Sequence, residues 1–160
     1  IGHDSRNSAT RIKNVVINSL RSFGCSVYDC SLCSTPAMFM AISILKCTSS
    51  IEITASHLPS EKNGFKFFTS YGGLQPEDIE NILQLAQRDP EVSPKDIGSV
   101  RQIDLMKYYT EKLKSVIREG IGSETEKPLK DMKIVVDAYL DNNLGDDLMI
   151  KLFADHFSRA

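Results

Sequence analysis

Apolar residues return about every 3.6 positions in two stretches near the start of the chain, which is the period of an amphipathic helix. The first stretch covers residues 9–23 and ends before Gly24, a residue type that commonly terminates helices. The second covers residues 37–45, with Ser34 or Thr35 as its cap and Pro36 in its first turn. The core-facing positions expected of the first helix are Ile12, Val15, Val16, Leu20 and Phe23.

Short stretches around the second helix predict strands. Residues 25–28 precede this helix and residues 50–54 follow it, so strand, helix and strand alternate as in a βαβ unit with parallel strands. Residues 65–68 form a further strand after an Asn-Gly turn, with the opposite direction, and its two-residue period turns Lys66 away from the neighbouring phenylalanines. The predicted fold class is α/β, with three α/β/α layers and a mixed sheet.

The rest of the chain alternates between predicted helices and exposed connections. A glycine turn at residues 72–73 leads into a helix that starts at Pro76 and carries two acids in its first turn. Its expected core-facing residues are Ile79, Ile82, Leu83 and Ala86. The elements expected after it are an exposed linker at 87–99, a helix at 104–118, a loop at 119–131, a buried strand at 132–137 and a final helix at 145–157.

Composition narrows the class of protein without identifying a function. The chain has 160 residues, of which 41% are hydrophobic and 25% charged, enough to bury one sizeable core with some chain to spare. The formal net charge of -2 gives no reason to expect nucleic acid or an anionic membrane as a partner. No apolar run approaches the ~20 residues that a membrane-spanning helix needs.

The four cysteines lie in the first third of the chain, at Cys25, Cys30, Cys33 and Cys47. Cys30 and Cys33 have the C-x-x-C spacing of a redox or zinc pair. No second pair of that spacing follows, and free cysteine packs as a small apolar residue, so buried reduced thiols are the expected state. A metal or redox site and structural disulfides are the alternatives, and a reducing compartment is the default.

One loop concentrates the candidate chemistry. The predicted strand at 50–54 runs into Ala55, Ser56 and His57, and the chain returns through Asn63-Gly64 to the strand that carries Lys66. A hydroxyl at the carboxyl end of a strand lies where ligands bind in α/β sheets. Ser56, beside a histidine and one strand from a lysine, is therefore well placed to exchange a phosphoryl group with a ligand.

These residues resemble a known active-site loop. Thr-Ala-Ser-His-x-Pro at residues 54–59, followed by Asn-Gly-Phe-Lys at 63–66, is similar to the phosphoserine loop of the α-D-phosphohexomutases, the family of phosphoglucomutase, phosphomannomutase and phosphoglucosamine mutase. The longer form, through Gly72-Gly73, is most similar to a plant plastid-type member. Gly2, Asp4 and Arg6 resemble a segment that supports this loop in the family. Within the loop, Leu58 stands where most members have an asparagine.

The resemblance covers residues 2 to about 137 and implies a domain organisation. Residues 1–100 are expected to form the first domain of a phosphohexomutase, incomplete at its N-terminus. Residues 101–130 are expected to be an inter-domain helix and linker, and residues 131–160 the beginning of the second domain. The expectation is therefore an N-terminal fragment of a longer enzyme, inactive on its own.

The resemblance also implies roles for five residues. Ser56 is expected to carry the phosphoryl group as phosphate moves between O1 and O6 of a hexose phosphate, and Lys66 to take part in proton transfer. His57 is expected either to orient the loop and phosphate or to act as an acid or base. Arg6 is expected either to contact phosphate or to pair with Asp4 and fix the loop. Asn63 is expected at the phosphate or substrate, with a turn position as its alternative.

The resemblance implies two further ligands. Magnesium is bound in the family by the phosphate of the residue matching Ser56 and by three aspartates of an Asp-Gly-Asp-x-Asp-Arg loop, which these 160 residues do not contain. Hexose 1,6-bisphosphate is the expected activator and intermediate. The expected location is a plastid or the cytoplasm. Neither the sugar nor the oligomeric state is indicated.

A non-enzymatic function is the rival hypothesis. A catalytically incomplete relative could be kept as a binding or regulatory module, and the departure from the family at Leu58 is compatible with it. An Asp-Gly-Asp-x-Asp-Arg loop in the parent protein would separate the two hypotheses in favour of the mutase.

Overall fold

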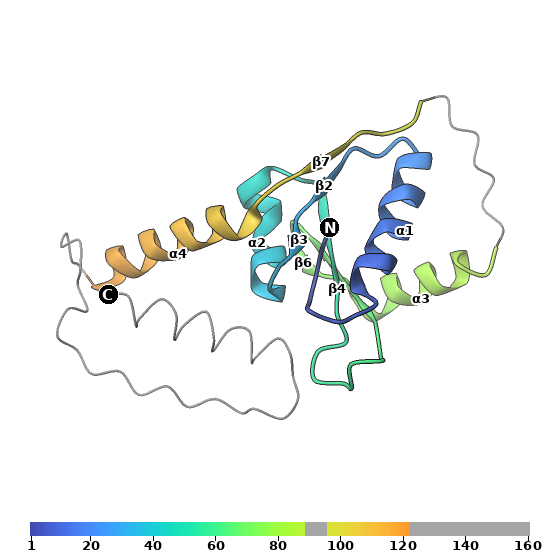
Figure 1. Cartoon of the computed structure of the whole chain (residues 1–160), viewed down its shortest axis with the longest axis horizontal. Coiled ribbons are helices and arrows are strands. Elements are labelled where there is room, and N and C mark those ends of the chain that lie inside the picture. Colours follow the sequence, from blue (N-terminus) through green and yellow to red (C-terminus); the bar gives the residue numbers. More distant parts are fainter. Residues whose placement is uncertain (89–95, 122–160) are drawn as a thin grey trace.

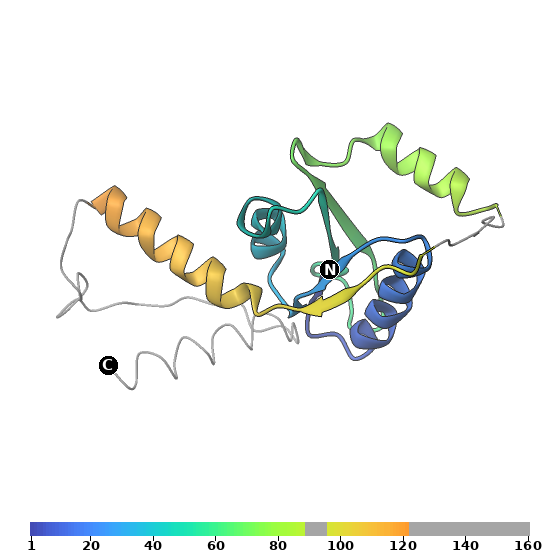
Figure 2. The same cartoon turned by 90° about the horizontal axis from the view of Figure 1, so that it is seen from above.

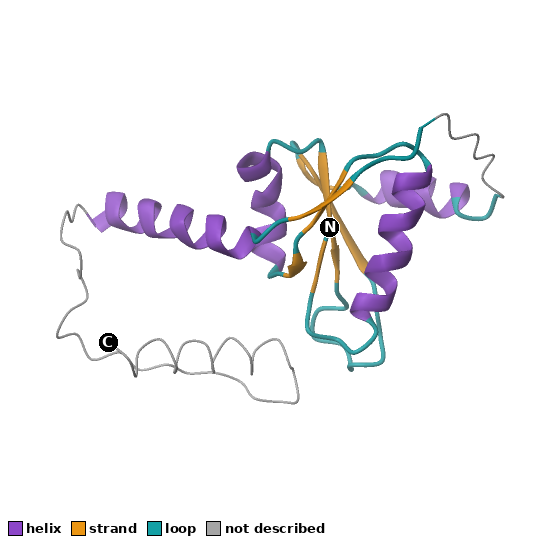
Figure 3. Ribbon diagram, turned by 45° about the horizontal axis from the view of Figure 1, so that its top comes forward, coloured by secondary structure: helices purple, strands orange, loops and turns teal. Residues whose placement is uncertain are grey.

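A five-stranded mixed sheet organises the described part of this computed structural model, which is residues 1–88 and 96–121 (Figures 1 and 3). Three parallel strands lie in the order β3, β1, β4, and two antiparallel strands, β5 and β6, continue the sheet. The bounds are β1 Gly2–His3, β3 Ser31–Leu32, β4 Ser49–Ile53, β5 Phe65–Thr69 and β6 Gly72–Gly73. The predicted α/β class with a mixed sheet is confirmed.

A second, two-stranded sheet corrects one part of the prediction. The strand expected at 25–28 is β2 (Val27–Asp29), and it pairs in parallel with β7 (Val100–Gln102) rather than joining β4. Ser31 adopts a left-handed conformation with φ of 53°, which interrupts the extended chain after Asp29. The chain then re-forms as β3 beside β1. β7 was not predicted, because three exposed residues after a linker carry no clear strand pattern.

Helix α1 (Ala9–Ser22) covers one face of the sheet. Ile17 packs there with Ile1, Val27 and Ile53, and Ile12, Val16 and Leu20 border the cluster. The prediction that Val15 and Phe23 also face the core is wrong, since they are 59% and 56% exposed. The inward position is taken by Lys13, whose ammonium lies 2.7 Å from the carboxylate of Asp29.

Helix α2 (Thr35–Leu45) covers the opposite face and begins as predicted. The Ser34 hydroxyl accepts a hydrogen bond from the amide of Ala37, and proline occupies the first turn. Met38 is fully buried in a cluster with Leu105, the first residue of α4 (Leu105–Ile121). Helix α4 starts against α2 and then extends away from the sheet (Figure 2). These two faces complete the three layers.

Helix α3 (Pro76–Leu85) forms where predicted, but it does not pack as predicted. Its N-terminus has proline in the first turn and a reciprocal capping box between Gln75 and Asp78, which accounts for its local stability. None of its residues is buried among the described residues, and the apolar side chains of Ile79, Ile82 and Leu83 are exposed. The expectation that they face the core is therefore wrong for this part of the chain.

Several predictions lie outside the described residues. These are the loop beyond residue 121, the strand at 132–137, the helix at 145–157 and most of the linker at 87–99. The domain boundaries near residues 100 and 130 stay predictions. Within residues 1–88 and 96–121, no helix combines the length and apolar character that crossing a membrane requires.

Candidate active site

The loop between β4 and β5 holds Ser56 at the carboxyl edge of the sheet. The amide of Thr54 donates to the carbonyl of Gly64 across the base of the loop, 3.0 Å away. The Thr54 hydroxyl in turn accepts a hydrogen bond from the amide of Ser56, also 3.0 Å away. Ser56 is exposed and has a φ of 55°, the left-handed region that side chains other than glycine occupy at a cost of about 1–3 kcal/mol. These interactions therefore fix the backbone that presents the Ser56 side chain at the edge of the sheet.

Arg6, three residues after the end of β1, holds this loop. One terminal nitrogen of its guanidinium donates to the carbonyls of Pro59 and Lys62, 2.6 and 3.0 Å away. The other donates to the carbonyl of Ser56 at 2.7 Å. Its Nε donates to Asp4 at 2.9 Å, and the side chain is only 7% exposed. Four hydrogen bonds thus converge on a buried cation that anchors the loop at three separate points.

The placement of Arg6 follows from the register of the sheet. β1 lies directly beside β4, with His3 opposite Ile53, and the amide of Asp4 donates to the carbonyl of Ile53. The chain therefore leaves β1 next to the point where the loop begins. Of the two roles expected for Arg6, this geometry favours fixing the loop through Asp4 over direct contact with phosphate.

Lys66 lies on the adjacent antiparallel strand, in register with Glu52 of β4. Residues directly opposite on antiparallel strands share a face, so Lys66 and Glu52 both lie on the α2 side of the sheet. Phe65 and Phe67 lie on the other face, with ring centroids 6.0 Å apart. The predicted separation of lysine from phenylalanines is confirmed. Lys66 is half-buried, and its side chain makes no hydrogen bond within the described residues.

Glu52 is the polar residue of this region that the sequence analysis missed. Its side chain is 1% exposed, and neither carboxyl oxygen has a hydrogen-bond partner in the part of the chain that the structure describes. Burial, with a smaller contribution from Asp4, raises the pKa of this carboxyl to about 8, although Lys66 opposes the shift. Glu52 is therefore largely protonated at neutral pH.

His57 and Asn63 lie on the exposed rim of the loop. His57 makes no hydrogen bond with the described residues. The Asn63 amide nitrogen donates to the hydroxyl of Ser8 at 2.8 Å, which ties the loop to the N-terminus of α1. Figures 1 and 3 show this end of α1 beside the loop. No acidic residue occupies the first turn of α1, so the positive end of its dipole faces this region uncompensated.

Among the described residues, no group of three or more histidine, cysteine, aspartate or glutamate side chains could hold a metal ion. Ser56, once phosphorylated, is the one expected magnesium ligand that this part of the chain contributes. The structure thus brings Ser56, Arg6 and Asn63 into one loop assembly and places Lys66 on the neighbouring strand.

Comparison with known proteins shows the family to which the chain is similar. A family model described as "Phosphoglucomutase/phosphomannomutase, alpha/beta/alpha domain I" matches residues 1–93. The chain is 32% identical over 145 residues to a phosphoglucosamine mutase of Aliarcobacter butzleri, covering 86% of this chain and 31% of the relative. It is 31% identical over 137 residues to a phosphomannomutase/phosphoglucomutase of Pseudomonas aeruginosa, covering 86% of this chain and 27% of that protein.

The fold is similar to that of a solved structure. A phosphoglucomutase/phosphomannomutase family protein from Burkholderia thailandensis superposes with a TM-score of 0.57 over 70% of this chain and 26% of that one, at 22% identity. The chain therefore spans about a third or less of the length of the relatives it matches.

Proposed function

Because the chain belongs to the phosphoglucomutase/phosphomannomutase family, we propose that Ser56 carries the phosphoryl group in an intramolecular phosphate transfer between O1 and O6 of a hexose phosphate. The single observation that supports this most strongly is the exposed Ser56 at the sheet edge, whose backbone is left-handed and whose carbonyl accepts a hydrogen bond from the buried Arg6. The similarity to named mutases does not favour the alternative of a binding or regulatory module.

Positioning is the first contribution of the chain's own residues. Phosphoryl transfer depends on alignment of donor and acceptor oxygens and on neutralisation of charge. Arg6 fixes the loop on which the Ser56 oxygen is presented. A phosphoserine carries a charge of about -1.5 to -2, which the N-terminus of α1, tied to the loop through Asn63, stabilises.

Proton transfer is the second contribution. The hydroxyl that receives the phosphoryl group must lose a proton, and the hydroxyl that releases it must gain one. Lys66, half-buried on the neighbouring strand and without a hydrogen-bonded partner in the described residues, is assigned this role. His57, exposed on the same loop, is assigned to orient the phosphate.

Magnesium fits this proposal only in part. The ion would neutralise charge on the transferred phosphoryl group, and the phosphate on Ser56 would be its ligand from this region. The other ligands that the family uses, three aspartates of an Asp-Gly-Asp-x-Asp-Arg loop, do not occur in these 160 residues. The hexose phosphate substrate, the bisphosphate intermediate and a plastid or cytoplasmic location are likewise parts of the proposal.

The proposal is tested by transferring labelled phosphate from hexose 1,6-bisphosphate to the full-length protein. We expect Ser56→Ala to abolish labelling and turnover while the circular dichroism spectrum and unfolding midpoint stay unchanged. Ser60→Ala, which changes an exposed serine of the same loop, is the matched control and should be labelled like wild type. Retention of label and turnover by Ser56→Ala would overturn the assignment.

A further inference from the structure

A buried carboxyl lies on the strand beside the lysine that is assigned to proton transfer. Glu52 of β4 and Lys66 of β5 are paired in register, so their Cβ atoms lie about 4.5–5.5 Å apart on one face of the sheet. Glu52 is 1% exposed, and neither carboxyl oxygen has a hydrogen-bond partner within residues 1–88 and 96–121. The half-buried Lys66 side chain has no hydrogen-bonded partner in these residues either. Each of the two groups therefore lacks what the other can supply.

Helix α2 covers Glu52 without offering it a partner. The Ser50 hydroxyl, on the same face of β4, donates to the carbonyl of Met38 at 2.6 Å and holds α2 against the strand. A Cβ at Gly2 of β1 would lie only 2.9 Å from a Glu52 carboxyl oxygen, so the carboxyl occupies the space that this glycine leaves. The sequence of α2, Thr35–Leu45, contains no titratable side chain. The layer above the carboxyl thus supplies no cation.

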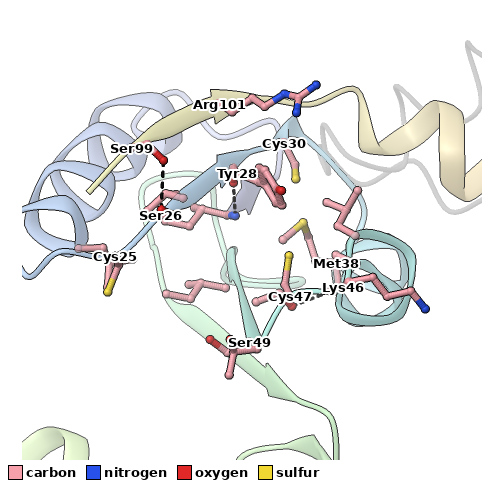
Figure 4. A pocket seen from close by; sticks show the side chains of 18 residues that line it. Cys25, Ser26, Tyr28, Cys30, Met38, Lys46, Cys47, Ser49, Ser99 and Arg101 are labelled. Carbon is pink, nitrogen blue, oxygen red and sulfur yellow. Dashed lines mark hydrogen bonds between the residues drawn. The ribbon is translucent and has the colours of Figure 1, made fainter. Parts of the chain in front are cut away.

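The cavity on this side of the fold does not reach Glu52. It lies between β2 and β4, and Figure 4 shows Met38 and the free thiols of Cys30 and Cys47 in its lining. Neither Glu52 nor Lys66 is among its lining residues. The cavity therefore gives the Glu52 carboxyl no contact with water, whereas Lys66 on the neighbouring strand is partly exposed.

The charges around Glu52 keep its carboxyl neutral at pH 7. Burial is the largest cause of the raised pKa of about 8, and the charge of Asp4 adds to it. Lys66 and the amino group of Ile1 act in the opposite direction, and a peptide bond before Ile1 would remove the second of these charges. The titratable groups that interact electrostatically with this carboxyl are the amino group of Ile1, Asp4, Cys30, Cys33 and Lys66.

We propose that Glu52 is a positioning residue for Lys66, and that its buried carboxyl supplies and takes back the proton that Lys66 exchanges with the reacting oxygens. In each transfer, the Lys66 ammonium protonates the oxygen that leaves phosphorus, and Glu52 restores the ammonium by giving up its own proton. The attacking hydroxyl then passes its proton to Lys66, which returns one to the Glu52 carboxylate. One proton moves from one oxygen to the other, and the pair ends as it began. This role rests on the proposed function.

Trace acylation of the lysines tests the pairing without any need for turnover. The full-length protein is treated with trace acetic anhydride between pH 6 and 10, and the modified peptides are quantified by mass spectrometry, since only the free amine reacts. Below pH 7 we expect equal Lys66 rates in wild type and Glu52→Gln, because a protonated carboxyl and an amide are both neutral. Above pH 8 the Glu52 carboxylate favours the ammonium form of Lys66. Lys66 should then react about 10-fold faster in Glu52→Gln than in wild type.

Two controls accompany the acylation measurement. Lys62 is exposed in the Ser56 loop, and Glu80→Gln changes an exposed glutamate of α3. Neither the Lys62 rates in Glu52→Gln nor the Lys66 rates in Glu80→Gln should differ from wild type. Glu52→Gln should fold, because an amide of the same shape replaces an unpaired carboxyl. Equal Lys66 rates in wild type and Glu52→Gln at pH 9 would overturn the proposal, since a merely structural carboxyl leaves Lys66 unaffected.

Turnover tests the catalytic part of the proposal. In the full-length protein, Glu52→Gln should lower kcat about 10-fold at pH 7 with KM unchanged, less than the ~10²-fold expected for the loss of Lys66 itself. Glu52→Asp, which keeps a carboxyl, should recover part of this loss. In the Lys66→Met background, Glu52→Gln should lower kcat no further, because Glu52 acts through Lys66. Losses that multiply in the double variant would contradict that coupling.

The two measurements distinguish failure of this inference from failure of the proposed function. If the acylation difference is found but Ser56 never carries phosphate, the pairing of Glu52 with Lys66 stands and its catalytic role falls with the proposed function. If turnover proceeds through Ser56 and the acylation rates are equal, the role of Glu52 alone is wrong.

Discussion

Replacing Arg6 by methionine removes the anchor of the active-site loop while keeping an unbranched side chain in the core. Four hydrogen bonds are lost, one to Asp4 and three to the carbonyls of Ser56, Pro59 and Lys62, at 2.6 to 3.0 Å. Hydrogen bonds of charged groups contribute about 1.5–3 kcal/mol each. The sum overstates the loss, because an opened loop can hydrate its carbonyls.

The stability cost of Arg6→Met is set by breaking one buried ion pair. Removing one partner of such a pair typically costs about 3–5 kcal/mol, and we expect about 3 kcal/mol here because Asp4 is 21% exposed. The loop should also open locally. Hydrogen exchange at the amides of Leu58 and Lys62, which donate to carbonyls within the loop, should approach that of an unstructured chain.

The assay combines urea unfolding with hydrogen exchange mass spectrometry. Arg11→Met, at an exposed arginine of α1, is the control and should change neither quantity beyond about 0.5 kcal/mol. If Arg6→Met loses no more stability than this control and keeps wild-type protection at Leu58 and Lys62, the anchoring role assigned to Arg6 is wrong.

Three further predictions concern neighbouring residues. The pKa of Glu52 is raised from 4.5 to about 8, so the free energy of unfolding of wild type falls as pH rises through this window. In urea unfolding, the stability of Glu52→Gln relative to wild type should therefore increase by up to about 4 kcal/mol between pH 5 and 8. A stability difference that does not change with pH contradicts the buried, unpaired carboxyl. Lys13→Met leaves Asp29 without its cation and should lower the free energy of unfolding by about 3–5 kcal/mol. Adding Asp29→Asn in the double variant should restore most of this loss. Strictly additive losses in the same unfolding assay would show that the two side chains do not form a stabilising ion pair. Lys66→Met should lower turnover of the full-length protein by about 10²-fold or more, and a near-normal rate in a coupled assay would reduce Lys66 to a structural residue.

The sequence predicts those features that local chemistry determines. The period of apolar residues located α1, the capping serine and proline located α2, and the β4 loop with Ser56 followed from the strand that precedes it. Each of these signals lies within a few neighbouring residues. Local signals do not predict a side chain's burial or a strand's pairing where these depend on a partner distant in sequence.

Glu52 illustrates what could not be predicted. Ile51-Glu52-Ile53 alternates as a strand with one polar face would, which suggests a solvated glutamate. The α2 layer covers that face, so the carboxyl is buried instead. The break at Ser31 is of the same kind, because a left-handed serine has no sequence signature, and it separates β2, which pairs with β7, from the rest of β3, which pairs with β1. The sequence predicted that Arg6 either fixes the loop or contacts phosphate, but it did not predict the three loop carbonyls to which Arg6 donates.

The most direct test of the central claim is the chemical state of Ser56 in the protein isolated from its native source. Peptide mapping by mass spectrometry of the full-length protein reports which side chain carries phosphate. We expect phosphate on the peptide that contains Ser56 and its loss when the protein is incubated with hexose monophosphate. An active protein whose phosphate lies on another residue, or whose Ser56 is never modified during turnover, would contradict the assignment of Ser56 as the phosphoryl carrier.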